Sequence, residues 1–502
     1  MTRKDGASNI DALDRSEPFD VCIIGSGFAG TVLGTELVQR GVRTLIVESG
    51  DSMLRWLFDS RMKNLAALQA SGDTNYPLKH MKSRILGGNS NFWTGRCERF
   101  HPSDLERNPY TPTNNSWPIT YKELDSYYER AEKTLRVRGG NLSEYTPPRT
   151  SPLPLFPKPD ISFLRSLFGN IGVTVDDSPT ATPTKALRFF RVQNEILPRF
   201  LASPHATLVS GVTVTQLIPD SNGKIVAAEA RTLDRERREI RARKYVVACG
   251  GIETPRLLLL SRSEQFPNGI GNAHDKVGRG FNEHAGVNFY ARIRHSWGTI
   301  CPTNKVGRTH QFYDQFRSEG LGSVLPVFRQ SWILFHHILP RKVSKLPENL
   351  FSLLTRLSRP TLYAGATIEM RISESNRVTL SRDKTDFFGN PIAHLTFNYS
   401  EDDLRTLDRA RDVILKIYKN LGATGVKEAD VTWSRHHQGT CRMGVNAAAS
   451  VTDSNLRVHE SPNLYLCGSE VFVTGGAIPP VLTITALAQR LADHLTTRLR
   501  GE

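Results

Sequence analysis

A glycine-rich turn between two apolar runs constrains the fold of this chain more than any other feature. Residues 21–24 form a short β-branched run, which is typical of a strand buried on both faces of a sheet. Gly25, Gly27 and Gly30 follow in G-x-G-x-x-G spacing. The first glycine permits a tight turn, the second lets the backbone approach a diphosphate, and the third lets a helix pack closely on the strand. The positive end of that helix also suits a diphosphate.

A second apolar run, residues 45–47, follows the predicted helix and ends at Glu48. An acidic side chain at the end of this strand can accept hydrogen bonds from both ribose hydroxyls, and it repels a 2′-phosphate. Two strands, the glycine turn and the acid together predict dinucleotide binding. This stretch does not by itself distinguish FAD from NAD.

Composition narrows the class of protein further. The 502 residues are enough for two domains, and no apolar run reaches the ~20 residues of a membrane span. The polar residues 1–18 predict a flexible tail rather than a secretory signal, so we expect a cytoplasmic protein. Six scattered cysteines without a C-x-x-C motif favour a reducing compartment and predict no metal site. The net charge is +15, but the basic residues are dispersed and match no nucleic-acid module, so no nucleic-acid partner is expected.

Local patterns predict most of the remaining elements. Residues 53–71 are predicted to be helical, and residues 121–135 form a charged amphipathic helix. Residues 212–218 and 225–232 read as two strands joined by a turn. A helix is expected over residues 252–261, with Thr254 as its N-cap and Pro255 at its first position.

Residues 286–397 are predicted to form a largely antiparallel sheet that covers one face of the dinucleotide-binding site. Its strand-like runs include residues 376–381 and 394–399, and a long amphipathic helix is expected over residues 402–421. Near the C-terminus, residues 463–469 are predicted to form a strand ending in glycine, and residues 475–492 a loop that opens an apolar helix. The chain therefore returns at its end to the sheet that it starts.

Two further segments carry polar groups beside glycines. Gly87 and Gly88 precede Ser90, an arrangement that offers several backbone donors for an anion or a ring edge, although an ordinary loop has the same pattern. Residues 435–444 read RHHQGTCRMG, with His436 followed by a second histidine, His437.

In their order along the chain, these motifs resemble the glucose–methanol–choline (GMC) oxidoreductases, FAD enzymes that oxidise alcohols. The likeness covers residues 21–48, 87–95, 117–131, 246–261, 278–284, 376–381 and 435–491. It implies an α/β fold with a discontinuous, Rossmann-like FAD-binding domain (residues 19–110, 190–285 and 430–502). A second, substrate-binding domain (residues 111–189 and 286–429) is then built on the largely antiparallel sheet.

The resemblance also implies roles for individual residues. Glycines of the first turn would lie on the diphosphate, Glu48 on the adenosine ribose, and the Val214 backbone on the adenine. Residues of the Gly87 segment would line the flavin and diphosphate, and the Pro480–Val481 backbone would meet the flavin edge near N1 and O2. His436 would be the catalytic base beside flavin N5, while His437 is interpreted as structural. The cofactor-binding residues implied in this way are Gly25, Gly27, Gly30, Glu48, Gly87, Gly88, Ser90, Trp93, Thr94, Val214, Gly468, Ser469, Pro480 and Val481.

The chain departs from the family pattern at two positions. The family's second catalytic residue, an Asn or His, is replaced by Pro479, which donates no hydrogen bond. The segment 88–94 is most similar to the pyranose and glycoside oxidase branch, where a histidine can carry covalent flavin. Phe92 stands at that position here, so the resemblance implies non-covalent FAD.

The main hypothesis is thus an FAD-dependent oxidase or dehydrogenase that acts on an alcohol, with a sugar or glycoside hydroxyl as the expected substrate. Proton abstraction by His436 would accompany hydride transfer to flavin N5. Two alternatives stay open at this point: a flavoenzyme with unusual or non-oxidative chemistry, because of Pro479, and a flavin-binding protein without turnover. The sequence leaves open whether oxygen or another molecule accepts the electrons.

Overall fold

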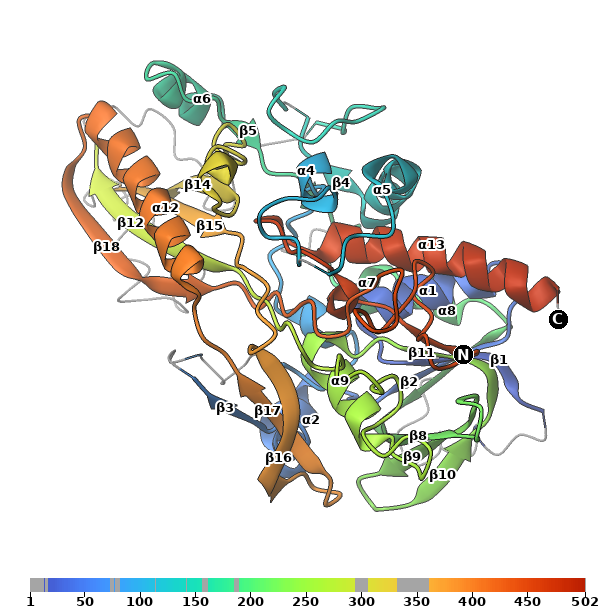
Figure 1. Cartoon of the computed structure of the whole chain (residues 1–502). Coiled ribbons are helices and arrows are strands. Elements are labelled where there is room, and N and C mark those ends of the chain that lie inside the picture. The colour runs from blue at the N-terminus through green and yellow to red at the C-terminus, as the bar shows by residue number, and fades with distance from the viewer. Residues whose placement is uncertain are drawn as a thin grey trace.

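A computed structural model describes residues 13, 17–72, 76, 82–112, 114–140, 142–155, 161–184, 189–293, 306–331 and 361–501 (Figure 1). Most of the expected tail, residues 1–18, lies outside the described residues. No helix of the described part is long and apolar enough to cross a membrane. The structure confirms the predicted α/β class: one parallel sheet is combined with antiparallel sheets.

Five parallel strands form the central sheet in the order β19-β11-β1-β2-β7. They are β1 (Phe19–Ile24), β2 (Thr44–Glu48), β7 (Ala206–Ser210), β11 (Ala242–Val247) and β19 (Leu464–Leu466). Strand β2 is buried along its whole length and β1 at every position except Asp20. Segments from the start, middle and end of the chain therefore meet in one sheet, with their carboxyl ends at the same edge.

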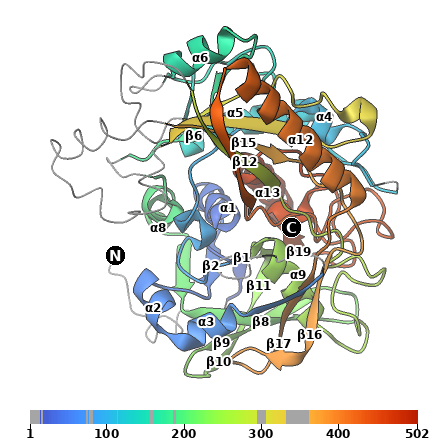
Figure 2. The same cartoon turned by 90° about the vertical axis from the view of Figure 1, so that its left-hand side faces the viewer.

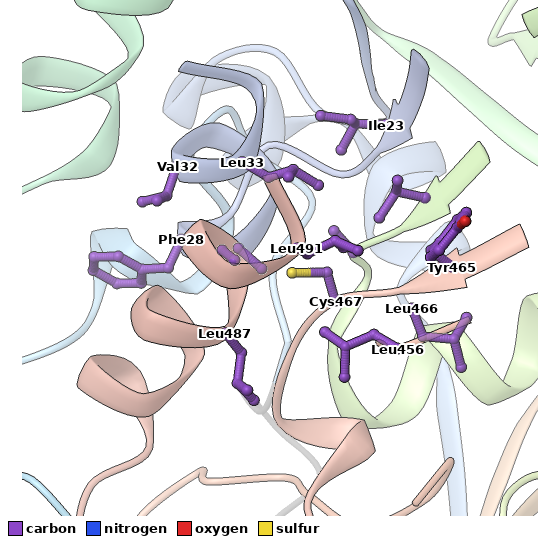
Figure 3. Packing of buried hydrophobic residues seen from close by; sticks show 14 of the residues in the cluster. Ile23, Phe28, Val32, Leu33, Leu456, Tyr465, Leu466, Cys467, Leu487 and Leu491 are labelled. Atoms are coloured by element: carbon purple, nitrogen blue, oxygen red, sulfur yellow. The ribbon is translucent and has the colours of Figure 1, made fainter. Parts of the chain in front are cut away.

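Three helices stack beside this sheet: α1 (Phe28–Val38), α5 (Tyr121–Leu135) and α13 (Val481–Arg500). Figure 3 shows side chains of α1, β1, β19 and α13 packed together, among them Val32, Tyr465 and Leu491. All three side chains are at most 1% exposed. The C-terminal helix thus closes the core that the N-terminal strand begins, because neither apolar face is covered without the other.

Helix α9 (Gly250–Leu260) begins earlier than expected and contains Pro255 in its interior, so the predicted start was wrong. A proline cannot donate to the carbonyl group four residues before it, here that of Gly251. The Thr440 hydroxyl donates to this carbonyl instead, at 2.9 Å, so the helix continues through the proline. The Thr254 hydroxyl accepts from the backbone N–H just before the helix, at 3.2 Å.

A six-stranded sheet, of which every pairing is antiparallel, stands beside the parallel sheet in the order β18-β12-β15-β14-β13-β5. Its strands are β5 (Asp176–Asp177), β12 (Ala285–Arg292), β13 (Gly307–Arg308), β14 (Val324–Ser331), β15 (Thr361–Ile368) and β18 (Thr424–Trp433). Helix α12 (Glu401–Asn420) begins at a capping box formed by Ser400 and Asp403, and packs on this sheet (Figure 1). The predicted antiparallel sheet and long helix are confirmed.

Strands β16 (Arg377–Thr385) and β17 (Pro391–Thr396) do not join that sheet, which corrects the expectation for residues 376–381 and 394–399. They pair with each other, and β17 pairs in parallel with β3 (Leu68–Ser71). This small sheet lies beside α9, at the far end of the molecule from α6 (Ser162–Gly169) (Figure 2). Pairing between segments so distant in sequence is decided by packing and leaves no local signal.

The predicted helix over residues 53–71 was also wrong in part. The structure has two short helices, α2 (Met53–Phe58) and α3 (Ser60–Leu65), followed by β3. Asp59 adopts an extended conformation between them, and its carboxylate accepts from the N–H of Arg61 to cap α3. An aspartate that caps a new helix ends the preceding one.

The other elements are shorter or lie at the edges of the molecule. They are η3 (Gly88–Asn91), α4 (Pro102–Leu105), β4 (Val137–Arg138), β6 (Thr180–Ala181), α7 (Val192–Glu195), α8 (Leu197–Leu201), β8 (Val212–Pro219), β9 (Ile225–Thr232), β10 (Arg237–Ile240), η4 (Arg317–Glu319) and η6 (Ser469–Val471). Strands β8, β9 and β10 form an antiparallel sheet of their own, and β4 pairs with β6.

Candidate active site

A cavity of about 550 Å³ opens at the carboxyl ends of the parallel strands and extends to the six-stranded antiparallel sheet. Its size is typical of a ligand pocket. The structure brings to it most of the residues singled out from the sequence: Gly25, Gly27, Glu48, Gly88, Ser90, Trp93, Thr94, Val214, His436, Gly468, Ser469, Pro480 and Val481. Gly30 and Gly87 are not among the lining residues and act behind the cavity wall.

The three glycines of the first turn differ in what a Cβ atom at each position would meet. Gly25 has a φ of +109°, and a Cβ there would lie 2.5 Å from the carbonyl oxygen of Ala248. A Cβ on Gly30 would lie 2.0 Å from the carbonyl oxygen of Gly25, so Gly30 allows α1 to approach β1. A Cβ on Gly27 would meet no atom within 4 Å. The space in front of Gly27 is therefore the part of the turn that is left for a ligand.

Glu48 lies at the end of β2 and organises the same turn. Its carboxylate accepts from the N–H and hydroxyl of Ser26, at 2.9 and 2.7 Å, and from the N–H of Gly50 at 2.8 Å. Burial raises the pKa of Glu48, and these hydrogen bonds oppose the rise. Oε1 accepts only the bond from Gly50 and keeps acceptor capacity, which a ribose hydroxyl can use.

The segment after Gly87 forms another wall. Gly87 has a φ of +84°, and its N–H donates to the Ser26 hydroxyl at 3.0 Å, which joins this turn to the first one. The Ser90 hydroxyl is buried and has no hydrogen-bond partner among the described residues. The Trp93 indole donates to the carbonyl group of Phe190 at 2.6 Å. Ser90 is thus an unused polar group at the edge of the cavity, as a bound cofactor requires.

His436 lies in the cavity wall and is held at two points. The Nδ1 atoms of His436 and His284 are 2.9 Å apart. The His436 backbone N–H donates to Glu283 at 2.6 Å, and the same carboxylate oxygen accepts from the His284 N–H at 2.9 Å. Glu283 therefore fixes the backbone of His436, and the adjacent His284 fixes its ring.

The surroundings of His284 determine which nitrogen of His436 carries a proton. The carbonyl groups of Gly475 and Gly476 favour a proton on the His284 ring, and the amide of Gln438 lies 3.0 Å from His284 Nε2. The amide nitrogen of Gln438 stands at this point, and turning the amide would bring its buried, unpartnered oxygen to His284 Nε2. In that orientation His284 donates through Nε2 and accepts through Nδ1, so His436 keeps its proton on Nδ1 and a free lone pair on Nε2.

Both rings of this pair are neutral near pH 7. Burial lowers the pKa of His284 to about 4. The pKa of His436 lies well below its usual value because of burial and the neighbouring His284, His437 and Arg308. Burial raises the pKa of Glu283 to about 7, and the N–H donors and the Tyr76 hydroxyl oppose that rise. An unprotonated imidazole in an enclosed site can accept a proton from a substrate.

His437 turns into the protein core. Its ring lies 5.6 Å from that of Phe281 and 6.3 Å from that of Tyr76, and its Nε2 is 3.7 Å from Glu283. The hydroxyl of Ser469 donates to its carbonyl group at 2.7 Å. This environment agrees with the structural interpretation of His437.

The loop before α13 completes the wall opposite the glycine turns. Pro479, Pro480 and Val481 line the cavity, and α13 begins at Val481. The N–H of Ala477 donates to the Tyr313 hydroxyl at 2.9 Å, which ties this loop to the segment between β13 and η4. Free N–H groups at the start of α13 therefore face the cavity from a fixed position.

Sequence reasoning assigned no role to several residues that the fold brings to the site. His284 and Glu283 lie in a segment that carried part of the family resemblance, but nothing in their spacing linked them to His436. Arg96 and Arg308 line the cavity, although both lack a motif. Lys82, Arg84, Glu253, Arg256 and Asp386 form a charged cluster at the end of the cavity near α9.

These features fit FAD. The glycine turn leaves space for a diphosphate, Glu48 offers acceptors to a ribose, and the unpartnered Ser90 hydroxyl and the start of α13 supply donors. Among the described residues, no group of three or more His, Cys, Asp or Glu side chains is arranged to hold a metal ion. The five cysteines in this part of the chain are free thiols.

Family models match the segments that build the site. Two models described as GMC oxidoreductase match residues 184–286 and 373–488, and one described as FAD binding domain matches residues 18–55. Together they cover both ends and the middle of the parallel sheet.

Individual proteins are similar over nearly the whole chain. The fructose dehydrogenase large subunit of Gluconobacter japonicus is 24% identical over 96% of this chain and 98% of its own length. Paromamine 6′-oxidase of Streptomyces fradiae is 27% identical over 96% of this chain and 92% of its own. The crystal structure of pyridoxine 4-oxidase from Mesorbium loti shares the fold, with a TM-score of 0.67 and 17% identity over 95% of this chain and 99% of that one. The chain belongs to the GMC oxidoreductase family and is an FAD-dependent oxidoreductase.

Proposed function

We propose that this enzyme oxidises a sugar or glycoside hydroxyl, with His436 as the general base. The observation that carries the proposal is the contact between His436 and His284, which leaves the Nε2 lone pair of His436 free in the wall of the FAD cavity. Fructose dehydrogenase, among the similar proteins, is named for a sugar substrate. The resemblance of residues 88–94 to the pyranose and glycoside oxidase branch supports the same substrate class.

Groups of the protein carry out every step of the proposed reaction except the acceptance of the hydride. When bound, FAD would supply the acceptor for the hydride that leaves the alcohol carbon. His436 takes the hydroxyl proton at Nε2, a contribution worth ~10²–10⁴-fold in rate. His284 holds the ring in place through Nδ1, and Glu283 holds the backbone. The substrate binds on the side of the cavity where Thr367 and Ser434 reach it from the antiparallel sheet and its edge.

Pro479 favours a second candidate, a flavoenzyme with unusual or non-oxidative chemistry. Pro479 lines the cavity and has no hydrogen to donate to a substrate oxygen. Three other donors, Arg308, Thr367 and Ser434, line the same cavity and can donate a hydrogen bond to the substrate oxygen instead. We therefore favour ordinary alcohol oxidation. A flavin-binding protein without turnover would have no use for the orientation of His436.

We further propose that FAD is bound without a covalent link. Phe92 lines the cavity, is 47% exposed, and has no atom that can bond to the flavin. The diphosphate, ribose and flavin contacts proposed for the glycine turns, Glu48 and the start of α13 are all non-covalent.

Anaerobic spectroscopy tests the proposal. The purified holoenzyme should show a flavin spectrum that bleaches when a sugar or glycoside is added without oxygen. His436→Ala should abolish bleaching while FAD stays bound, and His274→Ala, which changes an exposed histidine outside the cavity, should bleach normally. A flavin that no alcohol bleaches would favour the second candidate, and normal bleaching by the His436→Ala enzyme would exclude His436 as the base.

A further inference from the structure

Two arginines, Arg96 and Arg308, line the cavity close to His436. Arg308 is on β13 of the antiparallel sheet, and Arg96 follows the segment that carries Trp93 and Thr94. The charge of Arg308 contributes to the lowered pKa of both His436 and His284, so it acts directly on the proposed base. The two guanidinium groups repel each other, which together with burial lowers the pKa of Arg96 to about 10.

In the described part of the chain, these two cations face one shared carboxylate, that of Glu98. Arg308 is 8% exposed, and its Nε and Nη1 have no hydrogen-bond partner among the described residues. Its Nε is 3.3 Å from Glu98, whose carboxylate already accepts from the Ser178 hydroxyl at 2.5 Å. Arg96 faces the same Glu98. A further cation, Arg329, lies close enough to lower the pKa of Arg96 as well.

The acidic side chains of the neighbouring strand β5 are engaged by other groups. Asp176 and Asp177 pair with the backbone of β13. The Asp176 carboxylate accepts from the N–H and hydroxyl of Ser143, at 2.6 and 3.0 Å. Asp177 forms an ion pair with Arg165 at 3.1 Å. Among the described residues, Glu98 is therefore the one carboxylate in an ion pair with Arg308.

A buried guanidinium whose N–H groups lack acceptors is costly unless a ligand provides those acceptors. Arginine also has the fixed geometry that binds carboxylate and phosphate groups through two parallel hydrogen bonds. An anion at this point would offset the field of Arg308 and bring His436 closer to the pH at which a general base works best. The arrangement therefore benefits both binding and proton transfer.

From this geometry we infer that the oxidised alcohol carries an oxyanion, a carboxylate or a phosphate, that binds Arg308 and Arg96 while its hydroxyl reaches His436. The inference rests on the proposed alcohol oxidation and makes its substrate class narrower: a sugar acid, another hydroxy acid or a sugar phosphate rather than a neutral sugar.

Matched pairs of alcohols test the inference on the FAD-loaded enzyme. D-Gluconate is compared with D-glucitol, and D-glucose 6-phosphate with D-glucose, by anaerobic reductive titration at low ionic strength. The anionic member of at least one pair should reduce the flavin with an apparent Kd at least tenfold lower. The pair that shows the preference distinguishes a carboxylate from a phosphate. Equal behaviour within both pairs would overturn the inference, and bleaching by the neutral members would leave the proposed function standing.

Substitution of each arginine tests whether Arg308 and Arg96 cause the preference for anionic alcohols. Arg308→Gln and Arg96→Gln should each reduce the ratio of anionic to neutral affinity at least fivefold, while Arg409→Gln, an exposed arginine of α12, should leave the ratio unchanged. Binding of inorganic phosphate and of acetate, followed by calorimetry and by perturbation of the flavin spectrum, gives a readout without turnover. Anion binding that persists unchanged in both variants would overturn the assignment. Anion binding lost in the variants, with no alcohol oxidised by wild type, would support the site and reject the proposed oxidation.

Discussion

The Nδ1 atoms of His284 and His436 lie 2.9 Å apart, and only one of them can carry the proton between them. His284 comes from the start of β12 and His436 from the end of β18, two neighbouring antiparallel strands. We expect His284→Leu to slow flavin reduction roughly 10- to 100-fold, a part of the ~10²–10⁴ that a general base supplies, because the His436 ring loses its fixed orientation. Stopped-flow reduction under anaerobic conditions measures this.

The matched variant is His284→Asn, whose side-chain oxygen can occupy the position of Nδ1 and still accept from His436. It should recover a large part of the lost rate. Equal rates in the Leu and Asn variants would mean that His284 only fills space.

A pair of glycine variants separates folding from cofactor binding. Gly30→Ala places a methyl group 2.0 Å from the Gly25 carbonyl oxygen and should destabilise the protein by about 1–3 kcal/mol. Gly27→Ala meets nothing within 4 Å, so the apoprotein should stay within about 0.5 kcal/mol of wild type and lose affinity for FAD. Denaturant unfolding of the apoproteins and FAD titration measure the two effects. Tight FAD binding by Gly27→Ala would contradict a diphosphate at this turn.

Glu48 should contribute strongly to FAD affinity. Glu48→Ala removes a charged acceptor and the three hydrogen bonds that order the first turn, so we expect FAD to bind about 10- to 100-fold more weakly. Asp234→Ala, at an exposed acid far from the cavity wall, is the control. Ultrafiltration and flavin fluorescence give the affinities, and equal retention by both variants would reject the ribose assignment.

The pH dependence of flavin reduction reports the state of His436. Its pKa is lowered well below 6.5, and that of His284 is lowered to about 4, so both rings are unprotonated at pH 6.5 and above and the base remains competent there. Glu283, with a pKa of about 7, can add a transition of its own, so the measurement uses Glu283→Gln. The rate of this variant should be flat from pH 8 down through pH 6.5. A decline centred near 6.5 would show that His436 titrates normally.

Non-covalent binding of FAD has a direct test. Acid precipitation of the holoenzyme should release all of the flavin into solution, and the intact polypeptide should keep its mass of 56.2 kDa. A polypeptide heavier by the mass of FAD would contradict the prediction from Phe92.

The resemblance to the GMC family implied FAD, whereas the residue pattern by itself determined the parallel sheet and the glycine turn. These features depend on local patterns: apolar runs that form buried strands, glycines that permit one backbone geometry, and an acid at the end of β2. The sequence also predicted helix α12, because apolar residues repeated along one helix face are enough to indicate an amphipathic helix. Where a capping residue or a distant partner decided the outcome, as at Asp59, Pro255 and β17, the local pattern predicted a wrong boundary or a wrong sheet.

Only the tertiary structure decided what surrounds His436. Its contacts with His284 and Glu283 join residues that are 152 and 153 positions apart, and the antiparallel pairing of β12 with β18 brings them together. The charge excess at Arg96 and Arg308 likewise depends on which carboxylates the fold places beside them and which it uses elsewhere. A sequence shows which side chains are present, but hydrogen bonds and charge balance depend on distances, and folding sets those distances.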